Sequence, residues 1–115
     1  MHAPAALALR AGETLHTVLA AGATLPAARR VVCATQRPGQ RELVLELLEG
    51  EALRPIARAR FALPPGLPAN CWLPVEVQVD PDLRVRASAR ENLRRISVEA
   101  VFEPGDGPPG LYRVE

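Results

Sequence analysis

A chain of 115 residues is long enough to bury the core of one domain, but too short to hold a catalytic domain together with a substrate domain. Its hydrophobic fraction of 48% argues against intrinsic disorder. Its apolar residues nowhere run for the roughly 18 positions that a membrane-spanning helix needs. The net charge is +1, and all 14 basic residues are arginine, so the overall charge indicates no nucleic-acid partner. We therefore expect one soluble domain with no membrane association.

Twelve prolines and eight glycines divide the chain into segments that are mostly too short for ordinary helices. The first two segments flank a turn at Ala11–Glu13, where glycine can adopt a positive φ, and they predict a hairpin. A second turn, Gln36–Gln40, contains proline followed by glycine. The predicted strands, in chain order, are Ala6–Arg10, Thr14–Ala20, Arg29–Thr35, Arg41–Glu49, Ile56–Leu63, Val75–Asp80, Leu83–Arg90 and Arg94–Phe102.

The segment Arg41–Leu53 is ambiguous, because its leucines and glutamates also favour an amphipathic helix. We interpret it as a strand, since Leu43, Leu45 and Leu47 share one face at a period of two and glycines bound the segment. Val75–Asp80 shows the same period, with valines on one face and polar residues on the other. About eight such strands predict an all-β fold, an antiparallel β-sandwich.

The composition changes after Glu103 to a run of proline, glycine and aspartate. Such a run cannot support the hydrogen-bond ladder of a sheet. We therefore expect a sandwich domain over residues 1–103 and a linker or tail over residues 104–115.

Residue types that carry catalysis or bind metals are few. Ser88 and Ser97 lie in predicted strands and not in the Gly-x-Ser-x-Gly turn that exposes a nucleophile. His16 and Cys33 could form a base and thiol pair, but a buried strand cysteine is commoner. The histidines and cysteines form no close pair for a metal, and a lysine-dependent phosphate loop is excluded. We expect no enzyme activity, no metal and no cofactor in this chain, with ATP relevant only if a nucleotide-binding domain lies elsewhere.

Two features bear on location and on charged partners. Cys33 and Cys71 are expected to be reduced and packed, and no secretory signal is recognisable, so we expect a cytoplasmic setting. Arginines cluster in several predicted strands, which leaves a nucleic-acid face as a weaker hypothesis. Acidic residues interleave with these arginines, and we interpret the clusters as a solvated sheet surface.

Six short motifs occur in a specific order along most of the chain. They are Leu25-Pro26, Ala34-Thr35, Leu48-Glu49-Gly50-Glu51, Phe61-Ala62-Leu63 before a Pro/Gly-rich loop, Leu73-Pro74-Val75-Glu76-Val77-Gln78-Val79-Asp80, and Leu83-Arg84-Val85-Arg86-Ala87. This series resembles the peptide-binding β-sandwich domain of DnaK-type chaperones, the seventy-kilodalton heat-shock family. The likeness extends over roughly Pro4 to Phe102.

The resemblance implies a cleft at one end of the sandwich that holds an extended, apolar segment of an unfolded polypeptide. It implies no ATPase or helical lid within this chain, so a nucleotide-binding chaperone domain would be a separate partner. Where the family has a large aromatic pocket residue this chain has Cys33, and the arch over the peptide falls at Gln36. The peptide-binding positions implied by the resemblance are Leu9, Cys33, Gln36, Leu43, Leu45 and Val75.

Two alternatives remain open at this point. Leu43, Leu45 and Val75 are also the residues that an ordinary sandwich core would bury. The chain could therefore be a structural or interaction domain that has lost peptide binding, with an exposed edge strand pairing with a second copy.

Overall fold

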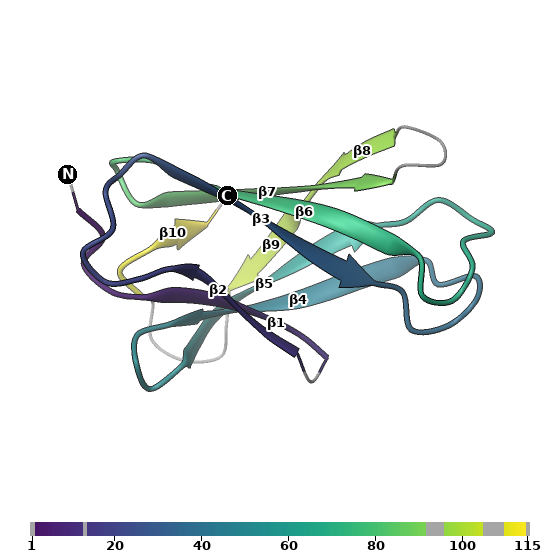
Figure 1. The fold of residues 1–115 in the computed structure, drawn as a ribbon, viewed down its shortest axis with the longest axis horizontal. Coiled ribbons are helices and arrows are strands. Elements are labelled where there is room, and N and C mark those ends of the chain that lie inside the picture. Colours follow the sequence, from purple (N-terminus) through teal and green to yellow (C-terminus); the bar gives the residue numbers. More distant parts are fainter. Residues whose placement is uncertain (1, 13, 92–95, 105–109, 115) are drawn as a thin grey trace.

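The computed structural model describes residues 2–12, 14–91, 96–104 and 110–114, and they form two β-sheets that face each other (Figure 1). The predicted all-β sandwich is confirmed, with ten strands in the described residues. The first sheet has the order β2 (Thr14–Leu19), β1 (Leu7–Ala11), β4 (Glu42–Glu49), β5 (Arg54–Ala62) and β9 (Val101–Pro104). The second has the order β10 (Arg113–Val114), β7 (Arg84–Glu91), β6 (Trp72–Val79) and β3 (Ala27–Ala34), and β8 (Ile96–Glu99) also pairs with β7. No helix among the described residues is long and apolar enough to cross a membrane.

The core forms where the apolar faces of the two sheets meet. On β4, the inward residues Leu43, Leu45 and Leu47 lie in register with Phe61, Ala59 and Ala57 of β5. Valines of β6 face them from the second sheet, and all of these side chains are buried. Burial of a Leu or Val side chain contributes about 1.5–3 kcal/mol. The strand interpretation of the ambiguous segment is confirmed, because every second residue of β4, and not residues at helical spacing, points into this core.

The chain changes sheets near its C-terminal end. We predicted one strand over Arg94–Phe102; residues 94 and 95 lie outside the described residues, and the remainder divides at Ala100. β8 pairs with β7 in the second sheet, whereas β9 pairs with β5 in the first. The backbone N–H of Ala100 donates to the Ala87 carbonyl at 2.9 Å, which holds the crossing point against β7.

The last described segment, residues 110–114, packs on the sandwich. We expected a linker or tail from residue 104, but the structure corrects this for residues 110–114; residues 105–109 lie outside the described residues. Glu49 Oε2 accepts hydrogen bonds from the backbone N–H groups of Leu111 and Tyr112, at 2.7 and 3.2 Å. The Tyr112 hydroxyl donates to the Ala5 carbonyl, and β10 then pairs in parallel with β7. A buried carboxylate and a buried aromatic ring therefore attach this segment to the fold.

The outer face of the first sheet carries alternating charge. Arg60 donates to Glu42 and to Glu103, and Arg10 lies 3.9 Å from Glu46. The hydrogen bonds that Arg60 donates to Glu103 and, to a smaller extent, to Glu42 raise the pKa of Arg60 above its usual range. These pairs make a mixed, solvated surface, in which Arg60 is matched by two carboxylates.

Candidate binding cleft

A cleft of about 640 Å³ opens between the edge strands of the two sheets. β2 ends the first sheet and β3 ends the second, and they lie near each other on the same side of the sandwich (Figure 1). The cleft is lined by β2, β3, the β1–β2 turn, the loop 35–41, the start of β4 and Asn70. Its volume falls in the range of about 300–1,000 Å³ that is common for ligand sites. This is the main candidate for a functional site.

The six positions implied by the family resemblance divide into two groups. Cys33, Gln36 and Leu43 line the cleft. Leu9, Leu45 and Val75 do not; each is at most 1% exposed and belongs to the core between the sheets. Cys33 and Leu43 are themselves only 3% and 5% exposed and belong to the same core, so Gln36 is the one exposed side chain among the six positions.

Several residues that the sequence analysis did not assign to the site also line the cleft. They include Thr14 and His16 of β2 and Val32 of β3. His16 pairs in register with Leu9, which places it on the inward face of β2. The turn at Gly12 and the strand period indicate which face of β2 carries His16, but its place in the cleft also depends on β2 being an edge strand. Thr14 follows the same register, opposite Ala11.

The wall of the cleft formed by loop 35–41 is anchored to the loop that precedes β6. Thr35 is 1% exposed, and its hydroxyl donates to the Pro68 carbonyl at 2.7 Å and accepts from the Cys71 N–H at 2.9 Å. The backbone N–H of Gly39 donates to the Leu67 carbonyl at 2.7 Å. These bonds tie two loops that are about 30 residues apart in the sequence, and they hold this wall in place without a ligand.

Amide side chains shape the open end of the cleft. The backbone N–H of Gln36 donates to Gln40 Oε1 at 2.8 Å, and Gln40 Nε2 donates to the Glu42 carbonyl at 2.7 Å. The Gln36 side chain extends to Gly12 in the β1–β2 turn, where a Cβ would lie 2.6 Å from Gln36 Nε2. Gln36 therefore connects the two sides of the cleft, in the position where the resemblance implies an arch.

Two ionisable groups of the cleft, Cys33 and Glu42, are respectively buried and ion-paired. Burial raises the pKa of the Cys33 thiol, so this group is protonated at neutral pH and is a poor nucleophile. The carboxylate of Glu42 accepts from Arg60 Nε at 2.9 Å and from Nη2 at 2.8 and 3.0 Å. Cys33 and Cys71 are both free thiols. The cleft therefore offers a ligand an apolar and amide-rich surface, which suits non-covalent binding better than covalent catalysis.

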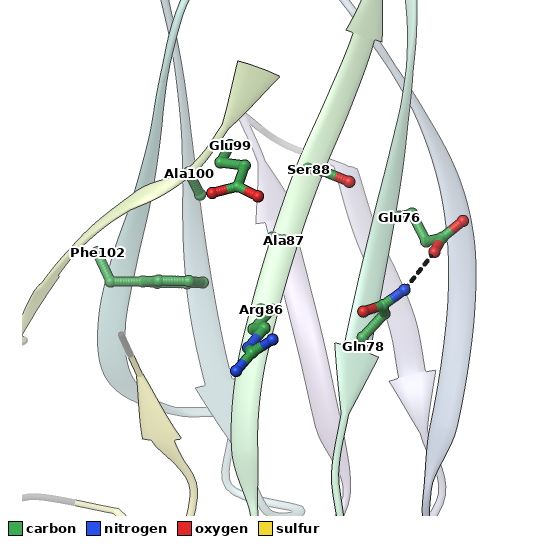
Figure 2. Close-up of a pocket in the computed structure, with 8 residues that line it drawn as sticks. All are labelled: Glu76, Gln78, Arg86, Ala87, Ser88, Glu99, Ala100 and Phe102. Carbon is green, nitrogen blue, oxygen red and sulfur yellow. Dashed lines mark hydrogen bonds between the residues drawn. The ribbon is translucent and has the colours of Figure 1, made fainter. Parts of the chain in front are cut away.

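A second hollow, of about 250 Å³, lies on the second sheet where the chain leaves β8 for β9 (Figure 2). Phe102 reaches toward β7 from one side, while Glu76 and Gln78 lie on β6 at the other side, joined by a hydrogen bond of 2.7 Å. Arg86 and Glu99 add both signs of charge. The hollow is smaller than most ligand sites and contains none of the predicted residues. Within the described ranges, no three His, Cys, Asp or Glu side chains gather as metal ligands would.

Comparison with known proteins adds no assignment. No protein-family model matches the chain, and no curated protein matches it. The function is therefore inferred from the geometry of the cleft and from the ordered motifs of the sequence.

Proposed function

We propose that this domain binds an extended, apolar segment of another polypeptide in the cleft between β2 and β3. The observation that carries the proposal is the position of the cleft, which opens between two edge strands and has Cys33 and Leu43 at its base. An edge strand presents backbone N–H and C=O groups that have no partner within its own sheet. An added peptide strand is the ligand that satisfies such groups.

The two kinds of contact have separate roles. Hydrogen bonds to the β3 backbone are available to any extended peptide, because they involve only main-chain atoms. An apolar side chain that enters the cleft adds about 1.5–3 kcal/mol for its full burial. Main-chain contacts therefore support binding in general, and the apolar side chain supplies selectivity.

Apolar residues at the rim of the cleft extend this surface. Val32 is 50% exposed and Trp72 is 72% exposed. The register places Val32 beside Pro74 and Ala34 beside Trp72 on the outer face of β3 and β6. Exposed apolar side chains that are contiguous are characteristic of interaction sites on soluble domains.

The proposal agrees with the family resemblance. The ordered motifs imply a chaperone-type peptide-binding domain, and three of the implied positions, Cys33, Gln36 and Leu43, line the cleft. The proposal assigns no catalytic step to this chain, and any ATP-driven control would come from a nucleotide-binding domain elsewhere. Free thiols at Cys33 and Cys71 fit a reducing compartment such as the cytoplasm.

A second candidate is an interaction domain that pairs with a copy of itself through β3. The observation that favours it is the Gln36 side chain, which already occupies the open end of the cleft beside Gly12. Under this hypothesis the cleft does not admit a peptide, and the eight-residue edge of β3 forms a continuous sheet between two copies. Light scattering over a concentration series tests it, since a constant monomer mass that accompanies peptide binding excludes it.

The test of the leading proposal is fluorescence anisotropy of a labelled, Leu-rich peptide titrated with the purified chain. Val32→Asp introduces a charge at the cleft, and Val101→Asp introduces the same charge at an exposed valine of β9. We expect Val32→Asp to weaken binding by about tenfold or more, because the bound peptide would desolvate the carboxylate. Val101→Asp is expected to bind as the wild type does. Absence of saturable binding by folded wild-type protein, or equal losses in the two variants, overturns the proposal.

A further inference from the structure

We propose that the extended segment bound in the cleft carries carboxylate side chains beside its apolar residue, and that arginines along β3 and the loop 35–41 select them. This inference rests on the proposed function and specifies its ligand. It concerns four residues: Arg29 and Arg30 on β3, and Arg37 and Arg41 in or next to the loop. All four are exposed.

The arginines lie along the path that an added strand would take. A peptide paired with β3 runs from Cys33 at the cleft toward Arg29 and Arg30, over three to four residues. At about 3.3 Å per residue, a side chain opposite Arg29 lies about 13 Å from the one opposite Cys33. In the other direction, β3 leads at Ala34 into the loop 35–41, which carries Arg37 and Arg41. An apolar residue in the cleft would therefore have arginines on both flanks.

The carboxylates of the protein do not neutralise these arginines. Glu42 is the only acidic residue among the described residues that line the cleft, and its carboxylate is bound to Arg60. Arg30 Nη2 lies 4.0 Å from Glu76 Oε2, and the Arg30 side chain is 70% exposed. An exposed ion pair at this distance contributes little free energy. Within the described part of the chain, Arg29, Arg37 and Arg41 have no ion pair. A ligand that brings its own carboxylates would supply the missing charges.

The position of Arg29 favours an acidic peptide over a second copy of this chain. Arg29 lies in register with Val77, on the inward face of β3, yet it remains exposed at the edge. An inward-pointing charge on an edge strand disfavours pairing with an apolar strand. Two copies paired through β3 about a two-fold axis, in the register that places Arg29 opposite Arg29 or Arg30 opposite Arg30, would bring like charges directly opposite each other, which is destabilising. A carboxylate on the incoming strand converts this repulsion into attraction.

The experiment compares three labelled peptides that share one Leu-containing centre and carry Glu, Gln or Arg on both flanks. We expect the Glu-flanked peptide to bind about three- to tenfold more tightly than the Gln-flanked one, as two to four exposed ion pairs allow. This difference should shrink as salt is raised, because exposed charges are screened. In the double variant R29Q/R30Q the preference for Glu should fall toward unity, while the affinity for the Gln-flanked peptide is retained. R58Q/R113Q, which removes two exposed arginines from β5 and β10, is the matched control and should keep the preference.

The outcomes separate this inference from the function on which it rests. If none of the three peptides binds to folded protein, the proposed function fails, and the inference fails with it. If the Gln- or Arg-flanked peptide binds as tightly as the Glu-flanked one, the cleft still binds peptide and only the inference is overturned. Equal loss of preference in R58Q/R113Q and R29Q/R30Q also overturns it, because the effect would then come from overall charge.

Discussion

The side-chain amide of Gln36 lies directly over the backbone of Gly12, so close that a Cβ on Gly12 would be 2.6 Å from Gln36 Nε2. This contact joins the loop between β3 and β4 to the turn between β1 and β2. Because β3 belongs to one sheet and β1 and β2 to the other, it connects the two sheets across the end of the cleft. Gly12 also has a φ of 60°, which glycine adopts without the strain that a Cβ causes.

Gly12→Ala is expected to destabilise the domain by about 1–2 kcal/mol through backbone strain, with a further loss from displacement of Gln36. Gly22→Ala is the matched control, since Gly22 has a φ of 85° and nothing within 4 Å of the added Cβ. Urea denaturation should show a larger loss for Gly12→Ala, and adding Gln36→Ala should recover the difference. Equal losses at Gly12 and Gly22 would show that the exposed Gln36 side chain moves aside at no measurable cost and does not hold the two sheets together.

Thr35 gives a second prediction, on the anchoring of the cleft wall. Thr35→Val keeps the shape of the side chain but removes the bonds to the Pro68 carbonyl and the Cys71 N–H. Loss of partners for these two backbone groups should cost about 2–3 kcal/mol of unfolding free energy. Thr17→Val, at an exposed position of β2, should change stability by less than about 0.5 kcal/mol. A Thr35 variant as stable as the Thr17 variant would contradict the assigned role.

Most of the sandwich could be predicted from the sequence because strand period and turn residues are local signals. Leu43, Leu45 and Leu47 share a face in any register, and glycines mark the turns on each side. The change of sheet at Ala100 left no such signal, since it depends on which strand each half of the segment meets. The packing of residues 110–114 was missed for a similar reason: the acceptor for Leu111 and Tyr112 is Glu49, about 60 residues earlier in the chain.

The candidate site could be predicted only in part. Apolar residues of a strand are obvious in the sequence, but whether they face a cleft or the core depends on the distance to the other sheet. Leu43, 5% exposed, lines the cleft, whereas Leu45, two residues further along the same face, is fully covered. His16 and Thr14 enter the cleft because β2 is an edge strand, and strand order cannot be read from local pattern.

Glu49 gives a third prediction. Its carboxylate is nearly buried and holds two backbone N–H groups of the last described segment. Glu49→Ala leaves both donors without this acceptor and should lower the unfolding free energy by about 2–3 kcal/mol. Glu51→Ala, at an exposed position two residues later, is the control and should have little effect. Faster amide hydrogen exchange of Leu111 and Tyr112 in the Glu49 variant would locate the change, and unchanged exchange would contradict it.

Tyr112 is the single tyrosine of the chain, so its ionisation can be followed alone by the ultraviolet absorbance of the phenolate. Burial, with the negative charge of Glu49, raises the pKa of Tyr112 above its usual value. Near pH 10 the unfolded chain therefore releases this proton while the folded protein keeps it. The stabilising effect is complete below the unfolded pKa of about 10, and it is lost as pH rises through the folded value.

Tyr112→Phe removes this titration together with the hydrogen bond to the Ala5 carbonyl. At neutral pH the variant should be less stable than the wild type by about 0.5–1.5 kcal/mol, the usual contribution of one such bond. Above about pH 10 the gap between the two proteins should narrow, because only the wild type loses stability through residue 112. Chemical denaturation at a series of pH values measures both quantities. Parallel stability profiles, or a phenolate that forms in the folded protein at the pKa of free tyrosine, would show that residue 112 is not buried against Ala5 and Glu49.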